Sequence, residues 1–126
     1  MSYDDLETSL RSMVDNEFAK RNTNLSEEIE KEFSRLAAKS LLSGSVGVNN
    51  TTELCVVDLT ERVQFIYEKM RIIVDSKNYS HSNELQEKAK DLFIEFSETA
   101  KDNCSEICSE SVNKINTGSV KAAYKE

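Results

Sequence analysis

The absence of proline constrains this chain more than any other feature, and only three glycines stand beside it in 126 residues. Proline and glycine punctuate chains that fold into many short strands, so this sequence has little with which to separate strands. Residues that favour helices, chiefly Glu, Lys, Leu and Ala, fill the long segments between the few break points. The sequence therefore predicts an all-α protein.

Apolar residues at helical spacing predict three long helical regions in a single domain over residues 1–118. We expect helices at about 3–42, 52–77 and 82–117, followed by a C-terminal tail at 119–126. Short connections between long helices favour antiparallel neighbours. The expected architecture is an extended antiparallel three-helix bundle with coiled-coil-like packing.

The first helical region carries two apolar stripes on different faces of the predicted helix. A polar stretch lies between the first stripe and the second. Asn24, with Glu27 three residues later, is typical of a capping box at a helix start. We favour a bend or break at residues 22–24, which would give four helices, and a single curved helix is the alternative. Gly44 is expected to end the region in a left-handed conformation, with a loop over 43–52.

The second helical region, capped by Thr51 or Thr52, is apolar on nearly opposite sides. Its heptad seam consists of Val56, Leu59, Val63, Ile66, Met70 and Ile73. A second apolar patch, on the far side of the same region, consists of Leu54, Phe65 and Ile72. A helix of this kind needs more than one neighbour. We therefore place it at the centre of the fold or against a partner, and expect the second patch to be a docking surface.

The third helical region combines an apolar face with an acidic one, and Gly118 follows it as an expected cap. The acidic residues are Glu84, Glu87, Asp91, Glu95, Glu98, Asp102, Glu106 and Glu110. Like charges four residues apart repel weakly on a helix, and a basic partner surface would relieve that repulsion. The plainer interpretation is an ordinary solvated face.

Net charge and hydropathy exclude several classes of ligand. Sixteen basic residues against 23 acidic ones give a charge of −7, which argues against nucleic acid and against a membrane surface. The longest fully apolar run, residues 54–57, is far shorter than the roughly 20 residues that a membrane-spanning helix needs. The acidic N-terminus does not resemble a signal peptide. We therefore expect a cytoplasmic protein.

The cysteines and the single histidine do not form a recognisable catalytic or metal motif. Cys55, Cys104 and Cys108 are odd in number and do not form a disulfide framework. Cys104 and Cys108 share one helix face and are interpreted as packing residues, with a thiol or soft-metal sensor as the alternative. His81 lies in a polar turn without a second histidine. We expect no catalytic site, no metal and no cofactor.

Heptads and helix caps are shared by many unrelated helical proteins, so they indicate no family. The leading hypothesis is a small non-enzymatic interaction or assembly module, which acts through self-association as a homo-oligomer or by docking a partner helix. The alternative is an acidic regulator or inhibitor that docks a basic surface of another protein through the Glu84–Glu110 face.

Overall fold

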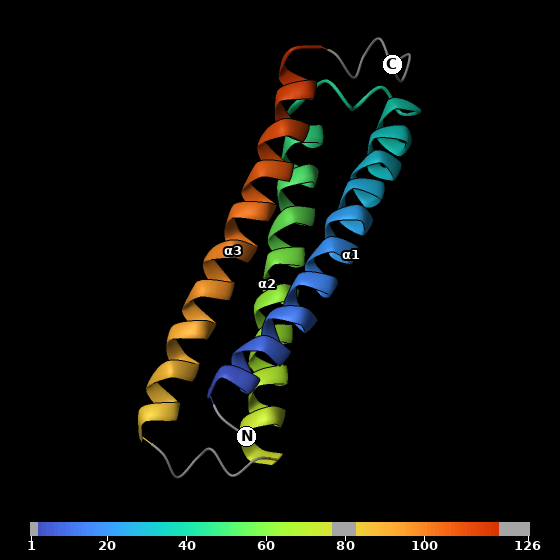
Figure 1. The fold of residues 1–126 in the computed structure, drawn as a ribbon. Helices are drawn as coiled ribbons and strands as arrows, with labels where there is room; N and C mark the ends of the chain where they lie inside the picture. The colour runs from blue at the N-terminus through green and yellow to red at the C-terminus, as the bar shows by residue number, and fades with distance from the viewer. Residues whose placement is uncertain (1–2, 77–82, 119–126) are drawn as a thin grey trace.

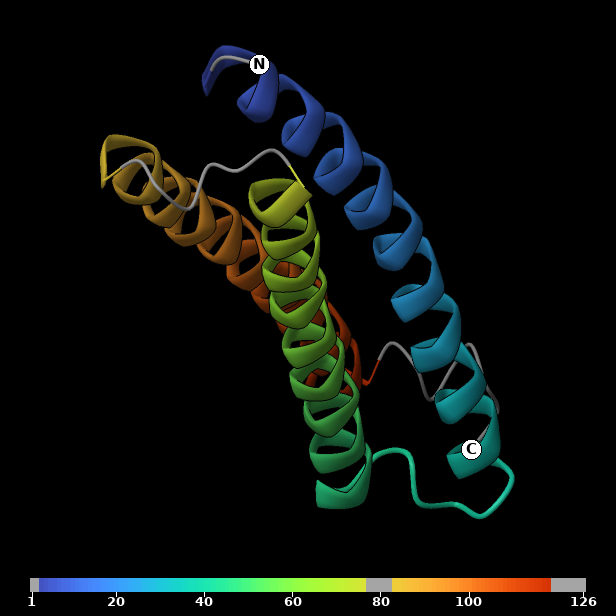
Figure 2. The same ribbon diagram turned by 90° about the horizontal axis from the view of Figure 1, so that it is seen from below.

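The structure of this protein, a computed structural model, describes residues 3–76 and 83–118. They form three helices, α1 at Tyr3–Ala37, α2 at Ser45–Ser76 and α3 at Asn83–Asn116. The prediction of an all-α protein is confirmed for these residues. The helices lie side by side along one long axis, and each begins at the end of the molecule where the preceding helix finishes (Figure 1). The helix α2 packs against both α1 and α3; α1 crosses in front of it in Figure 1, and Figure 2 shows α3 and α1 on its two sides.

The first helix continues without interruption through the expected break. Residues 22–24 are helical, and the Thr23 hydroxyl donates a hydrogen bond to the Ala19 carbonyl, 3.3 Å away and one turn earlier. The expected break, and with it the four-helix alternative, is therefore wrong. Arg21 and Asn22 are half-buried and belong to the same continuous helix.

The first helix ends earlier than expected, at Ala37 instead of about residue 42. Ser40 takes the left-handed conformation with a φ of 56°. The Leu41 N–H donates to the Leu36 carbonyl at 2.9 Å, and the Ser40 N–H donates to the Ala37 carbonyl at 3.0 Å. These two bonds form a Schellman motif, so Ser40 ends the helix in place of the expected Gly44.

The second helix begins at Ser45, so the expected loop over 43–52 and the expected threonine cap are wrong. The Gly44 carbonyl accepts a hydrogen bond from the Val48 N–H at 3.5 Å, which places Gly44 at the start of α2. Thr52 lies inside the helix, where its hydroxyl donates to the Val48 carbonyl at 2.9 Å.

Close backbone contact explains why a glycine occupies the first turn of α2. A Cβ atom at Gly47 would lie 2.2 Å from the Leu42 carbonyl oxygen, a distance that no side chain tolerates. Glycine has low helix propensity, and this tertiary contact overrides it. The connection therefore folds tightly against a helix that starts seven residues before the expected position.

The third helix runs over Asn83–Asn116, within one residue of the expected range at each end. Gly118 has a φ of 77°, and its N–H donates to the Ile115 carbonyl at 3.2 Å, as expected of a cap residue. The expected turn around His81 and the tail at 119–126 lie outside the described residues.

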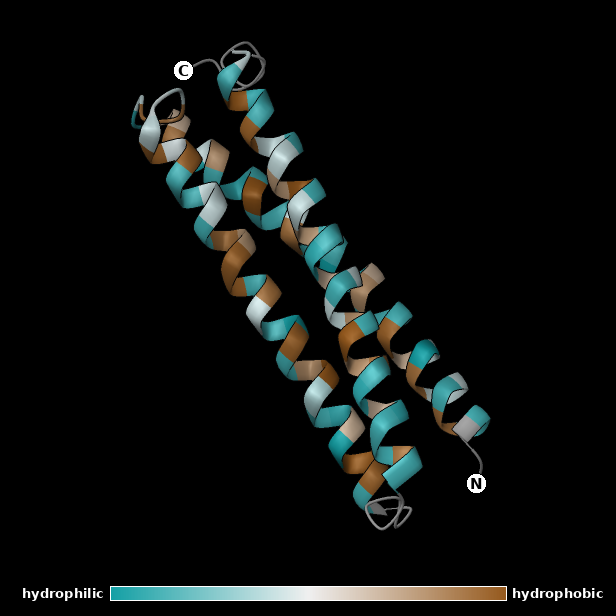
Figure 3. Cartoon of the chain, turned by 90° about the vertical axis from the view of Figure 1, so that its left-hand side faces the viewer, coloured by the Kyte–Doolittle hydropathy of each residue, from teal (hydrophilic) through white to brown (hydrophobic). Residues whose placement is uncertain are grey.

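The interior consists of two apolar clusters, one in each half of the molecule. The first contains Leu6, Leu10, Val14, Phe18, Ile66, Met70, Ala89, Leu92, Phe96 and Ala100. The second contains Leu25, Ile29, Phe33, Leu36, Leu42, Cys55, Cys104 and Ile115. The two apolar stripes of α1 thus enter different clusters. Accordingly, hydrophobic residues recur at intervals along the helices in Figure 3.

A buried charge lies between the two apolar clusters. The Arg62 side chain is 0% exposed, its Nε donates to Asp58 Oδ2 at 2.6 Å, and its guanidinium lies 5.3 Å from the centre of the Phe18 ring. Asp58 also accepts from Arg21 Nη1 of α1 at 3.3 Å and from the Cys104 thiol of α3 at 3.5 Å. All three helices therefore meet at one carboxylate.

Removing that carboxylate should destabilise the protein strongly. Asp58→Ala is expected to lower the free energy of unfolding by about 3–5 kcal/mol, because it leaves the buried Arg62 charge without its partner. Adding Arg62→Met should restore most of the loss, since methionine fills a similar volume without a charge. Urea unfolding followed by circular dichroism measures both effects.

The exposed pair of Arg71 and Asp75 on α2, 3.7 Å apart, provides a matched control. Asp75→Ala should change the free energy of unfolding by less than about 0.5 kcal/mol, because water screens an exposed pair. If Asp58→Ala cost no more than Asp75→Ala, the buried pair would not hold the helices together as argued.

Candidate functional site at the α2–α3 edge

Two grooves lie between α2 and α3, and no residue of α1 lines either of them. The larger has a volume of about 450 Å³ and is lined by Tyr67, Met70, Arg71, Val74, Asp75, Gln86, Ala89, Lys90 and Phe93. The smaller has a volume of about 230 Å³ and is lined by Thr52, Cys55, Val56, Leu59, Cys104, Ser105, Cys108 and Ser109. Together they make one edge of the molecule concave, and we call this surface the α2–α3 edge.

Large apolar side chains project beside these grooves. Val56 is 55% exposed and lines the smaller groove, whereas Tyr67 is 53% exposed and lines the larger one. Tyr67 follows Val56 by eleven residues, about three helical turns, so both lie on one side of α2. The Tyr67 ring meets Phe93 of α3 edge to face, with ring centres 6.5 Å apart. Exposed apolar groups next to a concave surface are typical of an interaction site.

The exposure of Val56 corrects the expected heptad seam. The buried residues of α2 include Cys55, Arg62, Ile66 and Met70, so the core-facing line of α2 is displaced from Val56 by about one residue. Sequence reasoning missed Arg62. Its only signal is its spacing, three residues after Leu59 and four before Ile66, which is the spacing of the seam itself.

The expected docking residues, Leu54, Phe65 and Ile72, lie on another side of α2 than Val56 and Tyr67. Leu54 is half-buried and packs against the second apolar cluster. Phe65 is also half-buried, with the Lys69 ammonium 5.5 Å from its ring centre. Ile72 is 59% exposed. Leu54 also lines a cleft shared with α1, so this side of α2 adjoins α1.

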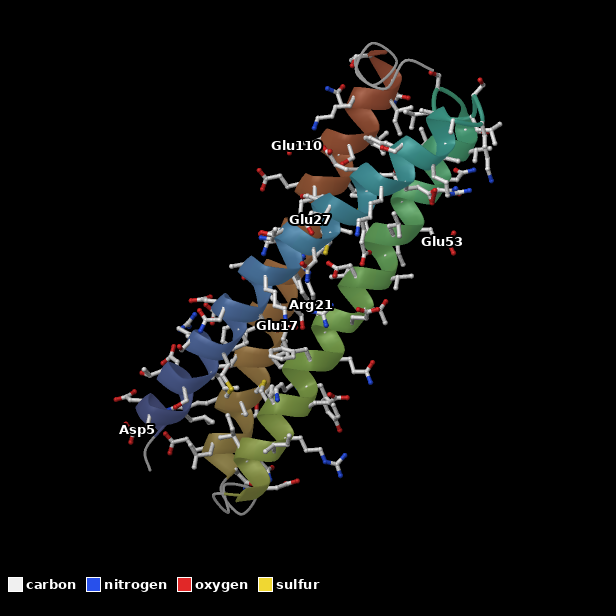
Figure 4. All side chains as sticks on the ribbon, turned by 90° about the vertical axis from the view of Figure 1, so that its right-hand side faces the viewer. Asp5, Glu17, Arg21, Glu27, Glu53 and Glu110 are labelled. Carbon is white, nitrogen blue, oxygen red and sulfur yellow. The ribbon has the colours of Figure 1, made fainter. Side chains whose placement is uncertain are left out.

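The acidic residues of α3 are all exposed to solvent along the helix, including Glu110, which is labelled in Figure 4. Glu84 pairs with Lys88 at 3.2 Å, and Glu95 pairs with Arg11 of α1 at 2.9 Å. The expected acidic face is thus a continuous exposed stripe, and one of its members helps to hold α1 against α3.

The cleft between α1 and α2, with a volume of about 270 Å³, contains a cluster of paired charges. Arg21 donates to Glu17 at 2.9 Å, to Glu61 at 3.0 Å and to Asp58 at 3.3 Å. Figure 4 shows Glu17 and Arg21 where α1 adjoins α2. Because the Arg21 guanidinium bonds carboxylates of both helices, the cluster braces α1 against α2.

The three cysteines meet at the smaller groove. Cys55 and Cys104 are buried and Cys108 is half-buried. Burial, with a smaller contribution from Cys108, raises the pKa of Cys55 to about 12. Burial also raises the pKa of Cys104 to about 11. Cys55 and Cys104 therefore remain protonated at neutral pH, and residues 3–76 and 83–118 hold no His, Cys, Asp and Glu cluster suited to a metal ion.

Comparison of the chain with protein-family models, with curated proteins and with solved structures gave no match in any of the three. Among the described helices, none is both long enough and apolar enough to cross a membrane.

The raised thiol pKa values predict a loss of stability in alkali. Unfolded thiols ionise near pH 9.0, whereas folded Cys55 and Cys104 keep their protons to about 12 and 11. The stabilisation is therefore complete below pH 9 and is lost as the pH rises through the folded values. When the pH rises from about 8 to 10, the free energy of unfolding of the wild-type protein should fall. The fall should exceed that of the Cys55→Ser/Cys104→Ser variant by about 1 kcal/mol per thiol. Urea unfolding at both pH values measures this, and equal losses would contradict it.

Proposed function

We propose that this protein is a non-enzymatic helical interaction module that assembles with a second copy of itself through the α2–α3 edge. The observation that carries the proposal is the pair of half-exposed residues, Val56 and Tyr67, beside two grooves on one surface. A twofold contact brings a surface against its own copy, so that surface must offer both protrusions and hollows. The α2–α3 edge offers both.

Packing of two such edges would enclose the exposed apolar groups between four helices. We propose that these helices pack antiparallel in the manner of a coiled coil, the arrangement that encloses apolar seams of this length in helical bundles. Val56 and Tyr67 would each lose contact with water, and burial of apolar surface is the main driving force for association of this kind.

The charges around the grooves are compatible with self-association. The larger groove is bordered by exposed Arg71 and Lys90 and by exposed Asp75, so both signs are present on one rim. None of the acidic residues of α3 lines either groove. The acidic residues of α3 therefore do not face their own copies directly across the proposed contact, which weakens repulsion between the two chains.

We further propose that the protein acts in the cytoplasm. Its three cysteines are unpaired, which suits a reducing compartment in which thiols are kept from forming disulfides. The acidic composition supports a protein partner over nucleic acid, because phosphate binding relies on clustered basic residues.

Size-exclusion chromatography with light scattering tests the proposed dimer. The wild-type chain should have about twice the 14.3 kDa mass of the monomer. Tyr67→Glu and Val56→Glu should each reduce the mass to that of the monomer, because each buries a charge in the contact. Ile72→Glu is the matched control, since Ile72 is equally exposed but lines neither groove, and it should remain dimeric.

Circular dichroism of each variant separates loss of contact from loss of fold. A wild-type chain that stays monomeric at every concentration would overturn the proposal. Dissociation by Ile72→Glu, with Tyr67→Glu still dimeric, would instead place the contact on the line of Leu54, Phe65 and Ile72.

A second candidate function is an acidic regulator, and the exposed Glu84–Glu110 stripe favours it. A fluorescent lysine-rich peptide should bind the protein and dissociate as salt is added, because salt screens exposed charges. Glu98→Gln/Asp102→Asn should weaken binding about fivefold, at roughly 0.5 kcal/mol per lost charge. Glu27→Gln/Glu53→Gln, at exposed sites on the other two helices, is the matched control. Equal effects of the two pairs would contradict a specific acidic face.

A further inference from the structure

Thiols from two helices converge on the floor of the smaller groove. Cys55 belongs to α2, whereas Cys104 and Cys108 belong to α3, and all three line the same 230 Å³ groove. The Cys108 thiol donates to the Thr52 hydroxyl at 3.9 Å, and Thr52 lies one turn before Cys55. The groove is open to solvent, so a small reagent can enter it beside Cys108, the most exposed of the three.

The two thiols of α3 have different surroundings. Cys104 is buried and donates to Asp58 Oδ2 at 3.5 Å, so it is bonded to the carboxylate that lies between the two apolar clusters. Cys108 of α3 is half-buried and interacts with Cys55 of α2. Cys108 therefore combines access from solvent with a second thiol on the neighbouring helix.

We propose that Cys55 and Cys108 form a thiol–disulfide exchange site, in which a small aliphatic disulfide oxidises them to a disulfide that links α2 to α3. This inference does not depend on the proposed dimer. It assigns a modification to a pair of residues 53 positions apart in the chain, which sequence spacing alone does not bring together.

The reaction proceeds in two exchange steps. Cys108 loses its proton, and its thiolate attacks one sulfur of the small disulfide, forming a mixed disulfide and releasing one small thiolate, which takes up a proton. The Cys55 thiol then loses its proton and attacks Cys108 Sγ, and the second small thiolate leaves and takes up a proton in turn. Two protein thiols are oxidised, one small disulfide is reduced to two thiols, and no net proton is gained or lost.

The inference is tested with bis(2-hydroxyethyl) disulfide, a neutral reagent that the acidic chain does not repel. Thiols are counted in denaturant after the reaction, and the linked peptides are identified by mass spectrometry. Wild-type protein should lose two of its three thiols, and Cys104→Ser should lose both of its two. Cys55→Ser should stop at the mixed disulfide on Cys108, and Cys108→Ser should keep both of its thiols.

Three results would overturn the inference: no loss of thiols, a linkage through Cys104, or links only between separate chains. Tyr67→Glu is treated in parallel, so that burial of Cys108 inside a dimer is not mistaken for an unreactive thiol. Circular dichroism before and after oxidation, and recovery of all thiols with dithiothreitol, show that the reaction occurs in the folded protein. A linkage found only after loss of helical signal counts against the site.

Discussion

The buried charge of Arg62 is the constraint on which the rest of the structure depends. A fully buried guanidinium is tolerated only when a carboxylate lies next to it, and Asp58, one turn earlier, meets that need. Asp58 also accepts hydrogen bonds from Arg21 and Cys104, so each of the other helices contributes one donor to it. A shift of either helix by one turn would remove its donor from Asp58. We therefore infer that this polar layer sets the register of the three helices, as single polar layers do in coiled coils.

The helix that carries Asp58 and Arg62 also carries the exposed apolar residues of the α2–α3 edge. Arg62 and Cys55 share the inward side of α2, and Val56 faces outward. Of the predicted heptad seam, Val56 therefore borders the smaller groove, whereas Ile66 and Met70 remain in the core. The exposed apolar residues and the buried ion pair thus lie on different sides of α2, and the proposed association would cover the exposed side.

These relations show which parts of the structure a single sequence could predict. The helical class and the ends of α3 follow from local signals, namely the absence of proline, a regular three-four pattern and a glycine cap. The continuity of α1 and the burial of Arg62 depend on partners in other helices, and an inward polar residue looks the same as a surface one in a sequence. The early start of α2 depends on the fit of Gly47 against the Leu42 carbonyl, a contact that no propensity encodes. The half-exposed edge at Val56 and Tyr67 was missed because Val56 has the spacing of the seam, and its exposure depends on how α2 packs against α3.

Salt should have opposite effects on binding at the acidic stripe and at the apolar edge, although both surfaces involve α3. Two copies that each carry a charge of −7 repel at long range, so added salt should favour their association while leaving the apolar contact intact. The same negative charge attracts a basic partner to the acidic stripe, and added salt weakens that attraction. The sign of the salt dependence therefore reports which face of the protein is engaged. It does so without knowledge of the partner, because the acidic side chains of α3 are separate from the residues that line the grooves.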